Sequence, residues 1–235
     1  MSLPSWGNVV PMRSSAPSAI VFDVNETLSD MSPLGARFVE VGASGTAAPL
    51  WFASVLRDGF ALTAAGENPA FASLARELLL LQLSQAQLNR PVEEAADHVM
   101  DGFARLELHA DVASGVDRLH GDGFRLATLS NGAAAVAERL LTQAGVRDRF
   151  ERLLSVEDAG AWKPTARAYE YAAQELDVKV EGLLLVAVHP WDVDGAARAG
   201  LQTAWVNRSD ATFPAVFTPP TYTVEGIEGL ADLWD

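Results

Sequence analysis

The 235-residue sequence predicts an α/β protein with a mostly parallel sheet and a helical insertion directly after the first strand. Two observations predict this fold. After residue 110, short apolar segments alternate with amphipathic ones, which is typical of βαβ units with right-handed crossovers. Between residues 31 and 109, in contrast, one helical pattern follows another. We therefore expect a core formed by residues 18–30 and 110–235, and a separate helical lobe formed by residues 31–109.

The chain begins with a segment that predicts no regular structure. Residues 1–17 contain three prolines, a glycine and four serines without any apolar period, so we expect a flexible lead-in. The first strand is then predicted at residues 19–22, a short apolar and partly β-branched run. It places Asp23 at its carboxyl end, where open α/β sheets carry their binding sites.

The insertion contains two clear helical stripes. Apolar residues step by three or four positions along 71–81 and again along 92–106, the spacing of an amphipathic helix. Ser32 and Asn68 are the expected N-caps. Four prolines stand where first helical turns would begin, namely Pro33, Pro49, Pro69 and Pro91. We expect these helices to pack on one another as a small bundle.

After residue 110 the elements of the core are expected in alternation. Strands are predicted at 124–129, 152–156, 183–188, 203–206 and near Tyr222. Helices are predicted at 132–144, at 165–176 and in the segment that ends at Ala197.

Charge and composition exclude several classes of protein. The chain carries 31 acidic and 17 basic side chains, a net charge of −14. This balance argues against nucleic acid and anionic membranes as partners, because both are bound mainly by basic side chains. The absence of cysteine excludes disulfides and thiolate nucleophiles. No apolar run approaches the ~20 residues that span a bilayer, and the N-terminus lacks a signal-peptide pattern. We therefore expect a cytoplasmic protein.

Polar residues follow four of the predicted strands. Asp23 follows the first strand, Ser130 and Asn131 follow the second, Lys163 lies beyond the third, and residues 189–192 (HPWD) follow the fourth. Each has a simpler structural explanation, as a helix cap, a turn or a solvated loop residue. However, the carboxyl ends of parallel strands lie side by side, so these residues can converge. A shared site explains all four better than four separate coincidences.

The same segments carry a resemblance to a known family. Residues 22–28 (FDVNETL), 129–132 (LSNG), 162–164 (WKP) and 191–196 (WDVDGA) resemble, in order and spacing, the four motifs of the haloacid dehalogenase superfamily. The resemblance covers nearly the whole chain after residue 17. It implies a Rossmann-like, doubly wound parallel sheet as the core, and it implies that the inserted helices are a cap over the catalytic Asp.

Two positions separate the branches of this superfamily. Most members are magnesium-dependent phosphatases with a second Asp two residues after the nucleophile, where this chain has Asn25, and with an acidic metal ligand where it has Ala187. Asn cannot exchange a proton, and magnesium prefers hard oxygen ligands. The departures resemble the metal-independent type II branch, the L-2-haloacid dehalogenases. A magnesium-dependent phosphatase and a non-catalytic ligand-binding member remain the alternatives.

The resemblance to the type II branch implies a reaction with neither metal nor organic cofactor. Asp23 would displace halide from a short 2-haloalkanoic acid and form an ester that water hydrolyses, so that an L-2-haloacid gives a D-2-hydroxy acid. Thr27 would orient Asp23, and Asp192 would position Lys163 or help to activate water. His189 is a candidate base for the hydrolysis, because imidazole titrates near neutrality, or else a hydrogen-bonded wall residue.

The resemblance also assigns the binding residues. Ser130 and Lys163 would hold the substrate carboxylate. The halide would be held by Arg57, Asn131 and Trp191, and the supporting residues would be Asn25 and Tyr169. The expected partners are therefore a small anionic substrate and a halide ion, with a homodimer implied by the resemblance.

Overall fold

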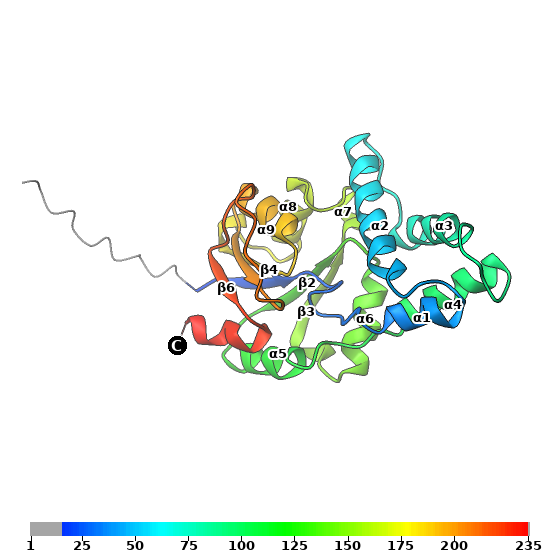
Figure 1. Ribbon diagram of the computed structural model, residues 1–235. Coiled ribbons are helices and arrows are strands. Elements are labelled where there is room, and N and C mark those ends of the chain that lie inside the picture. The colour runs from blue at the N-terminus through cyan, green and yellow to red at the C-terminus, as the bar shows by residue number, and fades with distance from the viewer. Residues whose placement is uncertain (1–15, 235) are drawn as a thin grey trace, which may run out of the picture.

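The computed structural model describes residues 16–234 and shows a parallel sheet flanked by helices, with a helical lobe to one side (Figure 1). The six strands have the order β3-β2-β1-β4-β5-β6. They are β1 (Ala19–Phe22), β2 (Leu126–Ser130), β3 (Phe150–Ser155), β4 (Leu183–Ala187), β5 (Gln202–Val206) and β6 (Tyr222–Val224). The helices of the core are α5 (Val112–Gly121), α6 (Ala134–Gln143), α7 (Val156–Ala159), α8 (Ala166–Glu175) and α9 (Pro190–Arg198). Of the expected lead-in, residues 1–15 lie outside the described residues.

The central strand β1 separates two apolar layers because successive side chains of a strand point to opposite faces. Ala19 and Val21 belong to the layer that includes α8 and α9, whereas Ile20 and Phe22 belong to the layer that includes α5 and α6. Strand β1 pairs in parallel with β2 on one side and with β4 on the other. The predicted doubly wound α/β core is therefore confirmed, and the predicted core strands and helices begin and end within two residues of the observed ones.

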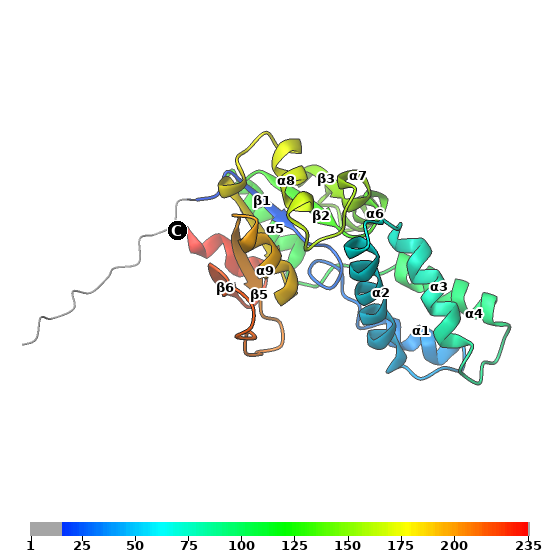
Figure 2. The same cartoon turned by 90° about the horizontal axis from the view of Figure 1, so that it is seen from above.

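The lobe consists of α1 (Leu34–Glu40), α2 (Ala47–Ala64), α3 (Phe71–Leu83) and α4 (Val92–Ala104), and Figure 2 shows it standing beside the sheet. Its two connections to the core run antiparallel to each other. The amide of Asp30 donates to the carbonyl of Glu107 at 2.8 Å, and the amide of His109 donates to that of Leu28 at 2.9 Å. The two connections therefore lie side by side where the lobe joins the core, and the boundaries 31 and 109 stay a prediction.

A second contact between lobe and core is made by Trp162, the residue before Lys163. Its ring stacks on Phe71 with the centroids 5.8 Å apart, and its indole N–H donates to the carbonyl of Pro69 at 2.9 Å. The Cα of Gly59 faces the same ring, which leaves no space for a side chain there. The lobe is thus fixed to the core at a point adjacent in sequence to Lys163.

Several local expectations were wrong or incomplete. The N-cap positions of α1 and α3 are Pro33 and Ala70, without a side-chain cap, rather than Ser32 and Asn68. The Asn68 side chain instead donates to the carbonyl of Val156 in the core at 3.2 Å. The sequence analysis also missed α5, α7 and three short 3₁₀ helices, Arg147–Arg149, Val180–Gly182 and Ile227–Leu233. In the part of the chain that the structure describes, no helix is both long and apolar enough to cross a membrane.

The close approach of Gly59 and Trp162 leads to a prediction about stability. A Cβ at position 59 would lie 2.3 Å from the indole ring, which is itself stacked on Phe71. We expect Gly59→Ala to lower the free energy of unfolding in urea by about 1–3 kcal/mol, because overpacking outweighs the gain in helix propensity. The control is Gly121→Ala, where a Cβ has nothing within 4 Å. Equal stability of Gly59→Ala and the wild type would contradict this packing.

Candidate active site

The centre of the candidate site is a lysine between two carboxylates. Lys163 Nζ donates to Asp23 Oδ1 at 2.8 Å and to Asp192 Oδ2 at 2.6 Å, and the lysine is fully buried. Asp23 follows β1, and Asp192 lies in the first turn of α9 after β4. Because β1 and β4 are neighbours, their carboxyl ends bring the two carboxylates to opposite sides of one ammonium group.

The pKa values of this group are set by burial and by mutual charge. Burial alone would raise the pKa of Asp23, but the charge of Lys163 and the hydrogen bond to His189 outweigh it and hold the pKa well below its usual range. Burial raises the pKa of Asp192 above its ordinary value, although Lys163 opposes this. Burial disfavours the charged form of Lys163, yet the two carboxylates raise its pKa. Asp23 is therefore an ionised carboxylate at neutral pH.

Two further side chains fix these groups. Thr27 Oγ1 donates to Asp23 Oδ2 at 2.7 Å and accepts from the amide of Val188 at 3.1 Å. The hydroxyl of Tyr169 donates to Asp192 Oδ1 at 2.6 Å. Both oxygens of Asp192 thus have partners within the protein. Thr27 and Tyr169 are both residues that the sequence analysis expected near this site. Their hydrogen bonds orient the carboxylates of Asp23 and Asp192.

Ser130 is the last residue of β2 and Asn131 follows it, but their side chains make different hydrogen bonds. Asn131 Oδ1 accepts from the amide of Lys163 at 3.0 Å, and its Nδ2 donates to the carbonyl of the same residue at 3.4 Å. The side-chain amide of Asn131 therefore supports the backbone of Lys163, and its second Nδ2 hydrogen is left for another acceptor. Ser130 Oγ accepts from the amide of Gly132 at 2.9 Å, which leaves its hydroxyl hydrogen for another acceptor.

His189 and Glu26 form a second charged arm on Asp23. His189 Nδ1 lies 3.1 Å from Asp23 Oδ2, and its Nε2 lies 2.8 Å from Glu26 Oε2. Burial would lower the pKa of His189, but hydrogen bonds to the two carboxylates raise it to about 9. The imidazole is therefore protonated at neutral pH and donates to both. Glu26 lies at φ +63°, a left-handed backbone conformation that favours glycine.

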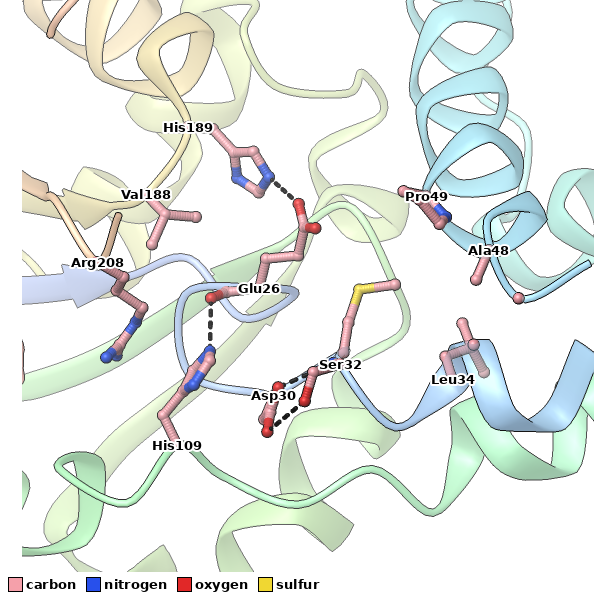
Figure 3. Close-up of a pocket in the computed structure, with 13 residues that line it drawn as sticks. Glu26, Asp30, Ser32, Leu34, Ala48, Pro49, His109, Val188, His189 and Arg208 are labelled. Carbon is pink, nitrogen blue, oxygen red and sulfur yellow. Dashed lines mark hydrogen bonds and ion pairs between the residues drawn. The ribbon is translucent and has the colours of Figure 1, made fainter. Parts of the chain in front are cut away.

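Glu26 is a residue that the sequence analysis did not assign to the site. Figure 3 shows its carboxylate turned toward His189 while its carbonyl accepts from His109. Both Glu26 and His189 line a cavity of about 590 Å³ between the core and the first turns of α1 and α2. The sequence signal for Glu26 was only its place in the first motif, three residues after the nucleophile. Its partner His189 comes from a different strand end, and only the fold pairs them.

Aromatic side chains of the lobe lie over the site. The ring of Phe52 lies 6.5 Å from that of His189, and Phe60 contacts Trp191 edge to face at 4.9 Å. Trp191 also packs beside His189 and lies 6.0 Å from Lys163 Nζ. Helix α2 thus supplies an apolar roof that keeps the charged groups in a medium of low dielectric constant, where their interactions are strong.

The structure does not bring Arg57 into this cluster. Its side chain is 70% exposed on α2 and pairs with the neighbouring carboxylate of Asp58 at 2.6 Å. Arg57 lies between Phe52 and Phe60 in sequence, but only those two side chains reach the residues around Asp23. Its role as a halide ligand therefore stays a prediction.

The residues present do not fit the magnesium ion that phosphatases of the resembling superfamily use. Both candidate carboxylates, Asp23 and Asp192, are bound to the ammonium group of Lys163. Asn25 and Ala187 stand where further acidic groups would be needed. Within residues 16–234, no group of three or more His, Asp or Glu side chains is arranged to hold a metal ion. An octahedral set of hard oxygen ligands is therefore missing at this position.

Comparisons with known proteins find relatives that match most of the chain. A family model of haloacid dehalogenase-like hydrolases matches residues 17–200. Haloacetate dehalogenase H-2 of Moraxella sp. (strain B) is 29% identical over 92% of this chain and 96% of its own length. An (S)-2-haloacid dehalogenase of Pseudomonas putida is 27% identical over 91% of this chain and 94% of its own.

Solved structures of dehalogenases also match the fold over most of the chain. A crystal structure of a dehalogenase superposes with a TM-score of 0.86 at 28% identity, covering 94% of this chain and 97% of the other. The L-2-haloacid dehalogenase of Xanthobacter autotrophicus with chloropropionic acid covalently bound shares the fold, with a TM-score of 0.83 at 24% identity over 93% and 98% of the two chains. The family match covers most of the sequence, so this chain belongs to the haloacid dehalogenase-like hydrolases.

Proposed function

We propose that this protein hydrolyses the carbon–halogen bond of short 2-haloalkanoic acids without a metal ion. The observation that carries the proposal is Asp23, an ionised and oriented carboxylate with a cation on each side, Lys163 and His189. Relatives named as haloacetate and (S)-2-haloacid dehalogenases, similar over more than nine-tenths of the chain, support the substrate class. The misfit of the donor set to magnesium argues against phosphatase chemistry.

In the first step, a carboxylate oxygen of Asp23 attacks C2 of the substrate. A carbon–oxygen bond forms while the carbon–halogen bond breaks, and the halide leaves with the bonding electron pair. Attack from behind inverts C2, so an L-2-haloacid gives a D-2-hydroxy acid. The approach of two anions is unfavourable, and the charges of Lys163 and His189 offset it at short range. Ser130 and Lys163 are the proposed ligands of the substrate carboxylate.

The departing halide needs donors or an aromatic edge near C2. Trp191 packs against His189 and near Lys163, which supports its proposed place in the halide site. Arg57 would serve there only after leaving Asp58. Asn131 positions the backbone of Lys163, and its second Nδ2 hydrogen is the one it would offer to the halide.

In the second step, water attacks the ester carbonyl of Asp23. Esterification removes the charge on Asp23 that raises the pKa of His189. Nδ1, which faces Asp23, then loses its proton to water in the adjoining cavity, while Nε2–H goes on donating to Glu26. The neutral imidazole then takes a proton from the attacking water. The tetrahedral intermediate collapses to the hydroxy acid and the Asp23 carboxylate, with the net release of one proton. We assign the role of base to His189, because its Nδ1 loses its carboxylate partner when Asp23 becomes an ester, whereas both oxygens of Asp192 stay engaged by Lys163 and Tyr169.

The homodimer implied by the family resemblance stays a prediction. Large apolar side chains exposed on the helices of the lobe support it. They are Val39, Leu50 and Leu81, which are 60%, 63% and 64% exposed.

Replacing the nucleophile tests the reaction itself. We expect the wild type to release halide from chloroacetate or L-2-chloropropionate at the same rate with and without EDTA, as measured with a halide-selective electrode. Asp23→Asn removes the attacking charge and should abolish release. The control Asp101→Asn changes a carboxylate whose side chain is 75% exposed and should behave as the wild type. The absence of halide release from every short 2-haloacid, or turnover that requires magnesium, would refute the proposal.

Replacing Glu26 tests the second step. Glu26→Gln keeps the size of the side chain but removes the charge that stabilises the His189 imidazolium formed when Nδ1 takes the proton from water. We expect hydrolysis of the ester to slow by roughly tenfold or more, while ester formation continues. Rapid quenching should then show one equivalent of halide released in a burst, and intact-protein mass spectrometry should detect the ester. An unchanged steady-state rate with no burst would show that Glu26 plays no part.

The pH dependence of kcat/KM tests the charge on His189. The pKa of Asp23 lies below its usual range, so Asp23 stays ionised across the neutral range. His189 is cationic below its pKa of about 9 and loses its charge as the pH rises through that value. We therefore expect kcat/KM to be flat near neutrality and to fall with a midpoint near pH 9. In Glu26→Gln the midpoint should move to lower pH. A profile without a basic limb below pH 10 would contradict the assignment.

A further inference from the structure

Asn25 lies beside the nucleophile, and within the described residues its side-chain amide has no hydrogen-bond partner. It lies two residues after Asp23, and it is 8% exposed. Its backbone pairs with that of Ser29, but within residues 16–234 its side chain makes no hydrogen bond, unlike every other polar side chain around Asp23 described above. Its polar atoms are not among the fully buried ones that lack a partner, so water or a ligand that enters the site can reach the amide and satisfy it.

The amide of Asn25 faces a small space above Gly132. A Cβ built on Gly132 would lie 3.4 Å from Ser130 Oγ, 4.0 Å from Asn25 Nδ2 and 4.0 Å from Phe71 Cγ. These are ordinary contact distances, so the space accepts a group of about the size of a methyl. Two of its walls are polar and the third is an aromatic ring of the lobe. Glycine at position 132 keeps this space free.

The two polar walls are both donors. Ser130 Oγ already accepts from the amide of Gly132, so its hydroxyl hydrogen points to another acceptor. Asn25 Nδ2 carries two hydrogens without acceptors. The Lys163 ammonium group is bound to Asp23 and is shared between two carboxylates. A pair of convergent neutral donors next to a cation suits an anionic group with two oxygens.

We propose that Asn25 binds the substrate carboxylate, donating from Nδ2 to one of its oxygens while Ser130 donates to the other. This inference rests on the proposed function and adds a determinant of its substrate class. An amide at position 25 attracts an acid, whereas an aspartate there would add a second negative charge and repel it. The Phe71 ring closes the space on the side of the lobe and limits the size of what can bind.

The test uses two probes, each of which represents one part of the substrate. Propionate carries the carboxylate without a leaving group, and bromide carries the halide without a carboxylate. Both are titrated calorimetrically into the wild type, Asn25→Ala and Gly132→Ala, with Asn89→Ala, an asparagine on the surface of the lobe, as the control. Inhibition constants against chloroacetate turnover are measured in parallel, and thermal melting verifies that each variant is folded.

We expect Asn25→Ala to weaken propionate binding by about tenfold or more, the effect of one hydrogen bond to a charged group, without changing the affinity for bromide. Gly132→Ala should stay folded and weaken propionate by filling the space, and Asn89→Ala should bind both probes as the wild type does. In turnover, Asn25→Ala should raise KM more than it lowers kcat.

Two outcomes would overturn the inference. These are unchanged propionate affinity in Asn25→Ala or Gly132→Ala, and a loss in Asn25→Ala that falls on bromide instead. Either result leaves the proposed function standing if the wild type releases halide. If the wild type releases no halide but propionate binding depends on Asn25, the reaction is refuted and the carboxylate contact remains.

Discussion

The site depends on one buried cation. An ammonium group with no exposure to solvent is stable only when its charge is paired and its hydrogens are bound, because the cost of removing it from water is several kcal/mol. Lys163 meets this condition with two carboxylates from neighbouring strands, Asp23 and Asp192. The groups around them serve the same arrangement. Asn131 holds the backbone of the lysine, and Tyr169 holds the second carboxylate.

This constraint also resolves an apparent conflict in the charge of the molecule. A net charge of −14 disfavours the approach of a small anion. Salt, however, screens exposed charges beyond ~8 Å at physiological ionic strength, whereas charges under an apolar roof interact with little screening. Lys163 is one of only two lysines in the chain and lies in this weakly screened interior. The local field at Asp23 therefore decides what binds, and the surface charge does not.

The sequence predicted the parts of the site that follow from strand order. Asp23, Ser130, Lys163 and His189 come together because parallel strands end at one edge, and the apolar runs that identify those strands are readable without a structure. Helix α5 was missed although Val112, Val116 and Leu119 form a buried stripe, because the sequence analysis assigned no element between the lobe and the strand expected at 124–129.

Contacts that depend on rotamers and on lobe packing could not be read from sequence. The contact of Arg57 with Asp58 is one example, because sequence adjacency does not show which of several acceptors a long side chain selects. The cap role expected for Asn68 failed for a related reason, since its amide instead joins the lobe to the core. Glu26 meets His189 across 163 positions, in a backbone conformation that the residue type does not predict.

The charges around Asp23 are arranged so that both neighbouring cations stay paired when the negative charge of Asp23 is lost. In the free enzyme Asp23 accepts from Lys163 and from His189, and each cation also has a second carboxylate, Asp192 or Glu26. When Asp23 becomes an ester, neither cation is left unpaired, so the buried network survives the change. The two arms then differ in one respect. Lys163 stays in the fully buried pair with Asp192, whereas the pair of His189 with Glu26 borders a cavity. The proton released by hydrolysis consequently has an exit on the histidine side only, and this asymmetry divides the roles of electrostatic support and base between the two cations.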